Sequence, residues 1–122
     1  MGFKITGLRS WNTDTASVED MVRFYRDGLG AEESNRHQVR GVDVVRLKLG
    51  STGLGLFDGR PDGVPHHTLE FEGPRTPEDM TNELESRGLK VTHTRMHGEG
   101  PGYSVYVDDP AGNHLELSTD PT

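Results

Sequence analysis

The amino-acid sequence predicts one α+β domain made of two copies of a β-α-β-β-β module, which form curved mixed sheets. Three observations support this fold class. The chain has 122 residues, which suffices for one domain but not for two. The segment Ser17-Val-Glu-Asp-Met21 recurs as Thr76-Pro-Glu-Asp-Met80. Three short strand-like segments follow each copy. We therefore expect a first module at about residues 1–59 and a second at about residues 64–120.

Both repeated segments carry the signals of a capped helix. Ser17 and Thr76 are predicted N-cap residues, whose hydroxyls can accept a backbone N–H, and acidic residues fill the turn that follows each of them. Pro77 suits the first helical position, where its missing N–H is not needed. Gly28 and Gly88 are the expected left-handed residues at the helix ends.

Short strands are expected around each helix, separated by clusters of Gly, Pro and Asp. A ferredoxin-like sandwich also mixes helices with antiparallel strands, but it does not predict three consecutive strands after each helix. The paired module is therefore favoured. The expected strands span residues 5–13, 32–39, 42–49 and 53–57 in the first half, and 66–72, 89–95, 103–107 and 114–118 in the second.

The composition narrows the range of partners and locations. A formal net charge of −7 and the lack of any basic run argue against nucleic acid and anionic membranes as partners. No cysteine is present, which excludes disulfides and thiolate chemistry. The sequence shows no signal-peptide or transmembrane stretch, so a cytoplasmic location is expected. Only 30% of residues are hydrophobic, and this small apolar supply favours burial between the subunits of a homodimer.

Two motifs resemble a known family. Asp109-Pro-Ala-Gly-Asn-His-Leu-Glu-Leu117 is similar to the turn-and-strand signature of the vicinal oxygen chelate superfamily, which includes glyoxalases, bleomycin resistance proteins and dioxygenases. Phe24-Tyr25-Arg26 with Gly28-Leu29-Gly30 resembles the helix end of the same family. The resemblance implies paired modules, usually completed as a homodimer. It also implies that Glu116 points into a cup formed by the curved sheet, where family enzymes use this glutamate to ligate a divalent metal.

The resemblance further implies where the other metal ligands would lie. Family enzymes place a histidine on the first strand, a second histidine on the strand after the linker, and often a fourth ligand. These positions are expected at Ser10, Thr68 and Gly55, none of which offers a usable ligand for Zn²⁺, Ni²⁺ or Fe²⁺. We therefore expect no metal cofactor. The alternative is a shifted site for Ni, Zn, Mn or Fe, formed by His66, His114 and Glu116 if the strand register differs.

The preferred functional hypothesis is binding of a small organic ligand, such as the sequestration of an antibiotic or other natural product without catalysis. Two enzymatic hypotheses remain open. One is a divalent-metal enzyme of the glyoxalase, epimerase, dioxygenase or thiol transferase type, and the other is a metal-free isomerase or cyclase that uses Glu116. Strand alternation and the loop before residue 103 predict the ligand-binding residues Ser10, Asn12, Arg46, Gly55, His66, Thr68, Glu70, Tyr103, His114 and Glu116.

Overall fold

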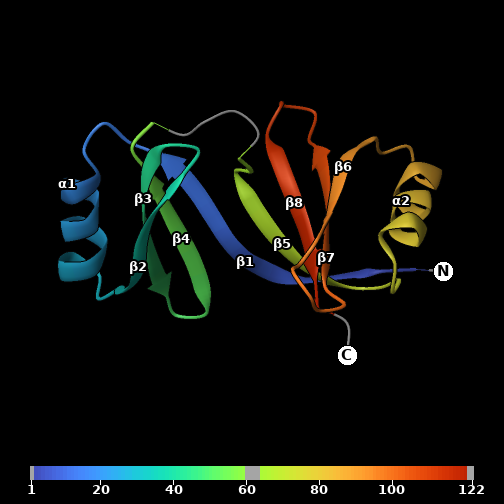
Figure 1. Cartoon of the computed structure of the whole chain (residues 1–122), viewed down its shortest axis with the longest axis horizontal. Coiled ribbons are helices and arrows are strands. Elements are labelled where there is room, and N and C mark those ends of the chain that lie inside the picture. Colours follow the sequence, from blue (N-terminus) through green and yellow to red (C-terminus); the bar gives the residue numbers. More distant parts are fainter. Residues whose placement is uncertain (1, 60–63, 121–122) are drawn as a thin grey trace. The chain divides into compact units, whose positions relative to one another are not determined.

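The computed structural model describes residues 2–59 and 64–120 and divides them into two compact units (Figure 1). The N-terminal module is Arg9–His66. The C-terminal module is the remainder, namely the residues from His67 onward together with the start of the chain up to Leu8. The boundary therefore lies close to the predicted linker, but the first residues of the chain belong with the second repeat. Phe3 explains this because it packs against the core of the C-terminal module.

The N-terminal module contains the first copy of the predicted motif. Its strands follow the order β2-β3-β4-β1, with β1 parallel to β4 and the other neighbours antiparallel. The helical segment contacts β4 through its first part. The elements are β1 (Lys4–Asp14, of which the part from Arg9 lies in this module), α1 (Val18–Val22), η1 (Arg23–Gly28), β2 (Glu32–Val39), β3 (Val42–Leu49) and β4 (Thr52–Phe57).

The C-terminal module repeats this topology. Its strand order is β5-β8-β7-β6, with β5 parallel to β8, and α2 contacts β6 and β7 (Figure 1). The mixed α+β fold predicted from the sequence is thus confirmed. The elements are β5 (His67–Glu72), α2 (Pro77–Ser86), β6 (Val91–Met96), β7 (Tyr103–Asp108) and β8 (His114–Thr119).

Each module has its own hydrophobic core between its helical segment and one face of its strands. In the N-terminal module Val22 packs with Leu54 and Leu56, and all three are buried. In the C-terminal module Met80 and Leu84 of α2 occupy the same place. Because side chains alternate along a strand, the intervening residues of each strand point to the opposite, polar face. No helix among the described residues is long and apolar enough to cross a membrane.

The predicted strands match the observed ones closely, and β2 and β3 match to the residue. The largest difference is at β6, which begins at Val91 rather than at Leu89. The backbone N–H of Leu89 donates to the carbonyl of Leu84 at 3.1 Å, so Leu89 is bonded to the end of α2 and does not join the strand. The strand β5 begins at His67 rather than at His66.

The two helix starts differ although their sequences repeat. The Thr76 hydroxyl accepts the Asp79 N–H at 3.2 Å, and Pro77 is the first helical residue, as predicted. Ser17 also stands at the N-cap position, as predicted, but its hydroxyl donates to the Asp20 carboxylate at 2.5 Å and caps no backbone group, so only the predicted hydrogen bond is wrong. The neighbouring acid offers Ser17 a charged acceptor, which competes with the capping geometry.

The two helix ends also differ. Gly88 adopts the predicted left-handed conformation, with φ of 84°. In the first module α1 continues into the π-helix η1, whose wider turns take up more residues before the chain reverses. The left-handed residue is therefore Gly30, with φ of 79°, and not Gly28 as predicted.

A pair of alanine substitutions tests this difference between the caps. Thr76→Ala is expected to lower the free energy of unfolding by about 1 kcal/mol, because it removes an acceptor for an otherwise unpaired N–H. Ser17→Ala is expected to change it by less than about 0.5 kcal/mol, as is usual for an exposed position. Urea unfolding followed by circular dichroism measures both values. Equal losses would show that both hydroxyls cap their helices.

Candidate functional site

The polar face of the C-terminal module is organised around the carboxylate of Glu116. The side chain is only 12% exposed. One oxygen, Oε1, accepts from the Thr68 hydroxyl at 3.1 Å, and the other, Oε2, accepts from the Ser104 hydroxyl at 2.6 Å. Oε2 also accepts from Nη2 of Arg95 at 3.2 Å. A carboxylate with little access to water needs such donors, so these three residues hold Glu116 in one orientation.

A hydrogen-bonded chain continues from Ser104 to the edge of the module. Ser104 is buried and donates its hydroxyl proton to Glu116, so its oxygen accepts from Nε2 of His97 at 2.6 Å. The other ring nitrogen of His97 lies 3.0 Å from the Asp120 carboxylate. Gly102 leaves the necessary space, since a Cβ there would lie 2.6 Å from Nδ1 of His97. The chain connects Glu116 to the half-exposed Asp120 side chain.

Three nearly parallel rings lie beside this chain, on β6, β7 and β8. The rings of His93 and Tyr106 stack with centroids 4.0 Å apart, and the rings of Tyr106 and His114 have centroids 5.6 Å apart. The Asp108 carboxylate lies 2.7 Å from Nδ1 of His114. Burial raises the pKa of Tyr106, and the Arg95 Nε–H donates to the Tyr106 hydroxyl at 3.1 Å. That contact in turn raises the pKa of Arg95, which stays charged.

The N-terminal module has a different polar row at the corresponding place. Asn12 on β1, Gly55 on β4 and Arg46 on β3 are register neighbours. Arg46 donates from Nη1 to Oδ1 of Asn12 at 3.0 Å and from Nε to Nε2 of His37 at 3.2 Å. The guanidinium also lies over the Phe57 ring, at 5.5 Å from its centroid. Arg46 reaches Asn12 across β4 because Gly55 has no side chain to block the path.

The registers of the two modules correct one predicted equivalence. Thr68 pairs with Glu116, and in the first module Asn12 pairs with Gly55. Ser10 pairs with Gly53 instead. The first-strand position equivalent to Thr68 is therefore Asn12, two residues beyond the predicted Ser10.

Several predicted lining residues come together and others do not. Asn12, Arg46 and Gly55 share one row in the N-terminal module, and Thr68, His114 and Glu116 share the polar face of the C-terminal module. Glu70 is exposed on the same strand face as Thr68, opposite Ser118. His66 precedes β5 in the N-terminal module, where its carbonyl accepts from the Asn12 N–H at 2.7 Å.

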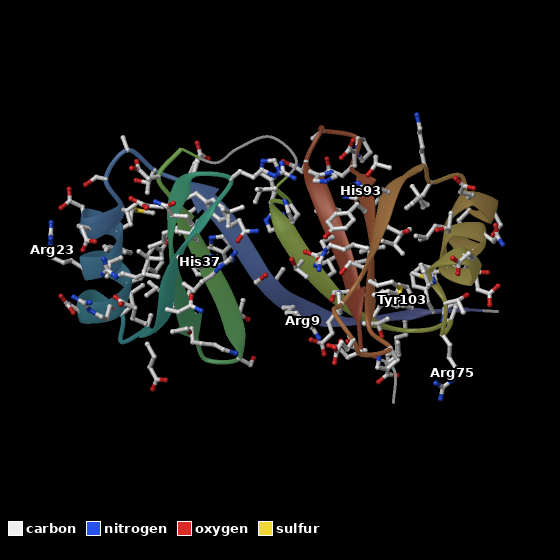
Figure 2. All side chains as sticks on the ribbon, in the orientation of Figure 1. Arg9, Arg23, His37, Arg75, His93 and Tyr103 are labelled. Carbon is white, nitrogen blue, oxygen red and sulfur yellow. The ribbon has the colours of Figure 1, made fainter. Side chains whose placement is uncertain are left out.

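Tyr103 does not lie at the site. Tyr103 (labelled in Figure 2) was predicted to bind the ligand, but it begins β7. Its side chain is buried in the apolar core, in the same cluster as Phe71 and Met80. Its hydroxyl donates to the Pro74 carbonyl. Strand parity is the physical reason, since Tyr103, Val105 and Val107 point toward α2 while Ser104 and Tyr106 point to the polar face.

Sequence reasoning missed five residues of the two polar faces. None of them was among the predicted ligand-binding residues. The available signal was alternation, because His93, Arg95 and His97 occur at every second position along β6 and its end, in phase with Ser104 and Tyr106. The missed residues are His37, His93, Arg95, His97 and Ser104.

The donor set at the register positions does not fit a divalent metal. Gly55 has no donor, the Asn12 amide is bonded to Arg46 and to the Pro65 carbonyl, and Thr68 donates to Glu116. Of the alternative trio, His66 belongs to the N-terminal module, and His114 and Glu116 belong to the C-terminal module. Within residues 2–59 and 64–120, no group of three or more His, Cys, Asp or Glu side chains is placed to hold a metal ion.

The fold and the motifs define the class of protein. Residues 15–117 match the model of the Glyoxalase/Bleomycin resistance protein/Dioxygenase superfamily. The chain belongs to this superfamily, which confirms the resemblance found in the sequence. No curated protein matches the sequence of the chain.

Solved structures with low sequence identity share the fold. Methylmalonyl-CoA epimerase from Mycobacterium tuberculosis has a TM-score of 0.67 at 17% identity, covering 97% of this chain and 90% of that one. A single-residue variant of the Streptomyces coelicolor methylmalonyl-CoA epimerase, in complex with 2-nitronate-propionyl-CoA, has a TM-score of 0.68 at 19% identity, covering 98% and 100%. The 2,2',3-trihydroxybiphenyl 1,2-dioxygenase from Sphingomonas wittichii strain RW1 has a TM-score of 0.66 at 23% identity, covering 93% of this chain and 42% of that one.

A substitution at Gly55 tests the row in the N-terminal module. In Gly55→Ala the new Cβ would lie 2.6 Å from Nη1 of Arg46, so the Arg46–Asn12 hydrogen bond must break or shift. We expect a loss of about 1–3 kcal/mol of unfolding free energy, in the range of overpacking substitutions. Gly53→Ala is the control because its nearest contact would be 3.2 Å, to Cβ of Ser10. Similar losses for both variants would contradict the importance of the Arg46 contact.

The buried hydroxyl of Tyr103 predicts a loss of stability at alkaline pH. Burial raises the pKa of Tyr103 from 10.0 to about 12, so the folded state keeps this proton longer than the unfolded state does. The resulting stabilisation is complete below pH 10 and is lost as the pH rises through about 12. In Tyr103→Phe, the urea midpoint should fall less over this interval than in the wild type. An identical fall would show that other groups cause it.

Proposed function

We propose that this protein binds a small organic molecule without a metal ion and without converting it, as in the superfamily members that sequester antibiotics or other natural products. The observation that carries the proposal is the state of Glu116. Its two oxygens accept hydrogen bonds from Thr68, Ser104 and Arg95, at the position where family enzymes ligate a metal. Thr68, which pairs with Glu116, and the pair Asn12 and Gly55 at the equivalent place in the N-terminal module have no imidazole or carboxylate.

The chemistry of the two polar faces supports ligand binding rather than catalysis. Arg46 and Arg95 provide guanidinium groups fixed by neighbouring side chains, and His93 provides an exposed ring. Such groups orient a ligand through hydrogen bonds and stacking. A nucleophile or acid–base pair would need a reacting atom within reach, whereas the Ser104 hydroxyl is fully buried and engaged with Glu116.

A homodimer in the cytoplasm belongs to the same proposal. Two large apolar side chains at η1 and its end are exposed, Phe24 by 59% and Leu29 by 61%. Exposed apolar surface on a chain with few hydrophobic residues supports its burial against a second subunit.

Thermal melting with and without metals tests the metal-independent mode of binding. The melting temperature is expected to stay unchanged with Ni²⁺, Zn²⁺, Mn²⁺, Fe²⁺ or a chelator, because a ligand stabilises only a protein that binds it. Elemental analysis of the purified protein should find no stoichiometric metal. Natural products screened in the same assay should include compounds that raise the melting temperature in the presence of the chelator.

Glu116→Gln provides the control for this experiment. The amide is close in size to the carboxylate and can still accept from Thr68 or Ser104, so the variant is expected to fold. A metal-dependent rise in melting temperature that is present in the wild type and lost in Glu116→Gln would overturn the proposal in favour of a metalloenzyme.

A further inference from the structure

We infer that Arg95 is the anchor for the ligand and that the ligand is a flat organic carboxylate. This inference rests on the proposed function and names the class of molecule that the site would take. Arg95 lies on β6, and its side chain is 55% exposed. A guanidinium has five N–H donors. One of them donates to the Tyr106 hydroxyl and one to Glu116, and the other three have no partner within the described residues.

Both anchors of Arg95 are themselves fixed, which holds the guanidinium in one orientation. Tyr106 is 5% exposed and its ring is stacked against His93. Glu116 is held from the opposite side by Thr68 and Ser104. A side chain immobilised before binding loses less conformational entropy when the ligand arrives, so its free N–H groups bind an anion more tightly than those of a mobile arginine.

The geometry favours a planar carboxylate over other anions. The free N–H groups of a guanidinium lie in one plane and match the two oxygens of a carboxylate. His93 lies two residues before Arg95 on the same strand, and its exposed ring is parallel to Tyr106, within 7°. A flat aromatic body can therefore stack on the ring of His93 while its carboxylate bonds to Arg95.

The simpler role for Arg95 would be to neutralise Glu116, and Arg87 shows what such an arginine looks like. Arg87 donates from both Nε and Nη2 to the same oxygen of Glu83, four residues earlier in the helical region. Arg95 gives Glu116 a single bond and uses Nε for a neutral phenol. The two side chains have similar exposure, 50% for Arg87 and 55% for Arg95. Arg87 is thus a matched control outside the polar face.

The test compares benzoate with the uncharged and nearly isosteric benzamide. Both are titrated into isotopically labelled protein, and the amide and Arg Nε–H resonances are followed by NMR. Benzoate should shift the Arg95 Nε–H resonance and bind about tenfold more tightly than benzamide, as expected for hydrogen bonds to a charged group. Arg95→Gln should abolish the tenfold preference, whereas Arg87→Gln should retain it. The amide spectrum of each variant confirms that it is folded.

Several outcomes would overturn the inference. These are an unshifted Arg95 resonance at tens of millimolar benzoate, equal binding of benzoate and benzamide, and an equal effect of Arg95→Gln and Arg87→Gln. Uncharged compounds that bind the Arg95→Gln variant as well as the wild type would exclude the carboxylate while leaving metal-independent binding intact. Binding of benzoate only after a divalent metal is added would instead refute the proposed function itself.

Discussion

The hydrogen bonding of a nearly buried carboxylate determines the arrangement of the C-terminal polar face. Glu116 cannot rely on water, so each of its oxygens must meet a donor from the protein. Thr68 comes from β5, Ser104 from β7 and Arg95 from β6, so one side chain of β8 links all four strands of the module. The positions of His97 and Tyr106 follow, because each of them bonds to one of the donors.

The two modules share the same strand topology and register, but their polar faces carry different side chains. Where the C-terminal module has Glu116 on its fourth strand, the N-terminal module has Gly55. Glu116 accepts hydrogen bonds from three neighbouring side chains. Gly55 has no side chain, so Arg46 extends across β4 and bonds to Asn12. Duplication therefore preserves the register of the strands and the apolar contacts with the helices, while the polar faces are free to diverge.

The fold could be predicted from the sequence because its signals are local and repeated. The Thr76 cap, the strand periodicity and the turn at Asp109–Asn113 each depend on a few neighbouring residues. Ser17 and Gly28 were misjudged because a competing acid and a π-helical turn override the same local signals. The site was harder to predict. Glu116, Thr68 and Arg46 were identified by parity, but Arg95 and His97 depend on which strands become neighbours. The prediction for Tyr103 was wrong because residue 103 points to the apolar face of β7, whereas its neighbour Ser104 points to the polar face.

The occupied space above Gly55 has a consequence for how this protein can change. A single substitution to glutamate would place a carboxylate in this space if it were empty. Here the Arg46 side chain already occupies the space, where it is bonded to Asn12 and His37 and lies over Phe57. A glutamate at position 55 would have to displace the Arg46 side chain, so further substitutions would be needed to accommodate the new carboxylate. Arg46 thus makes it difficult to add a carboxylate to this polar row through a single substitution.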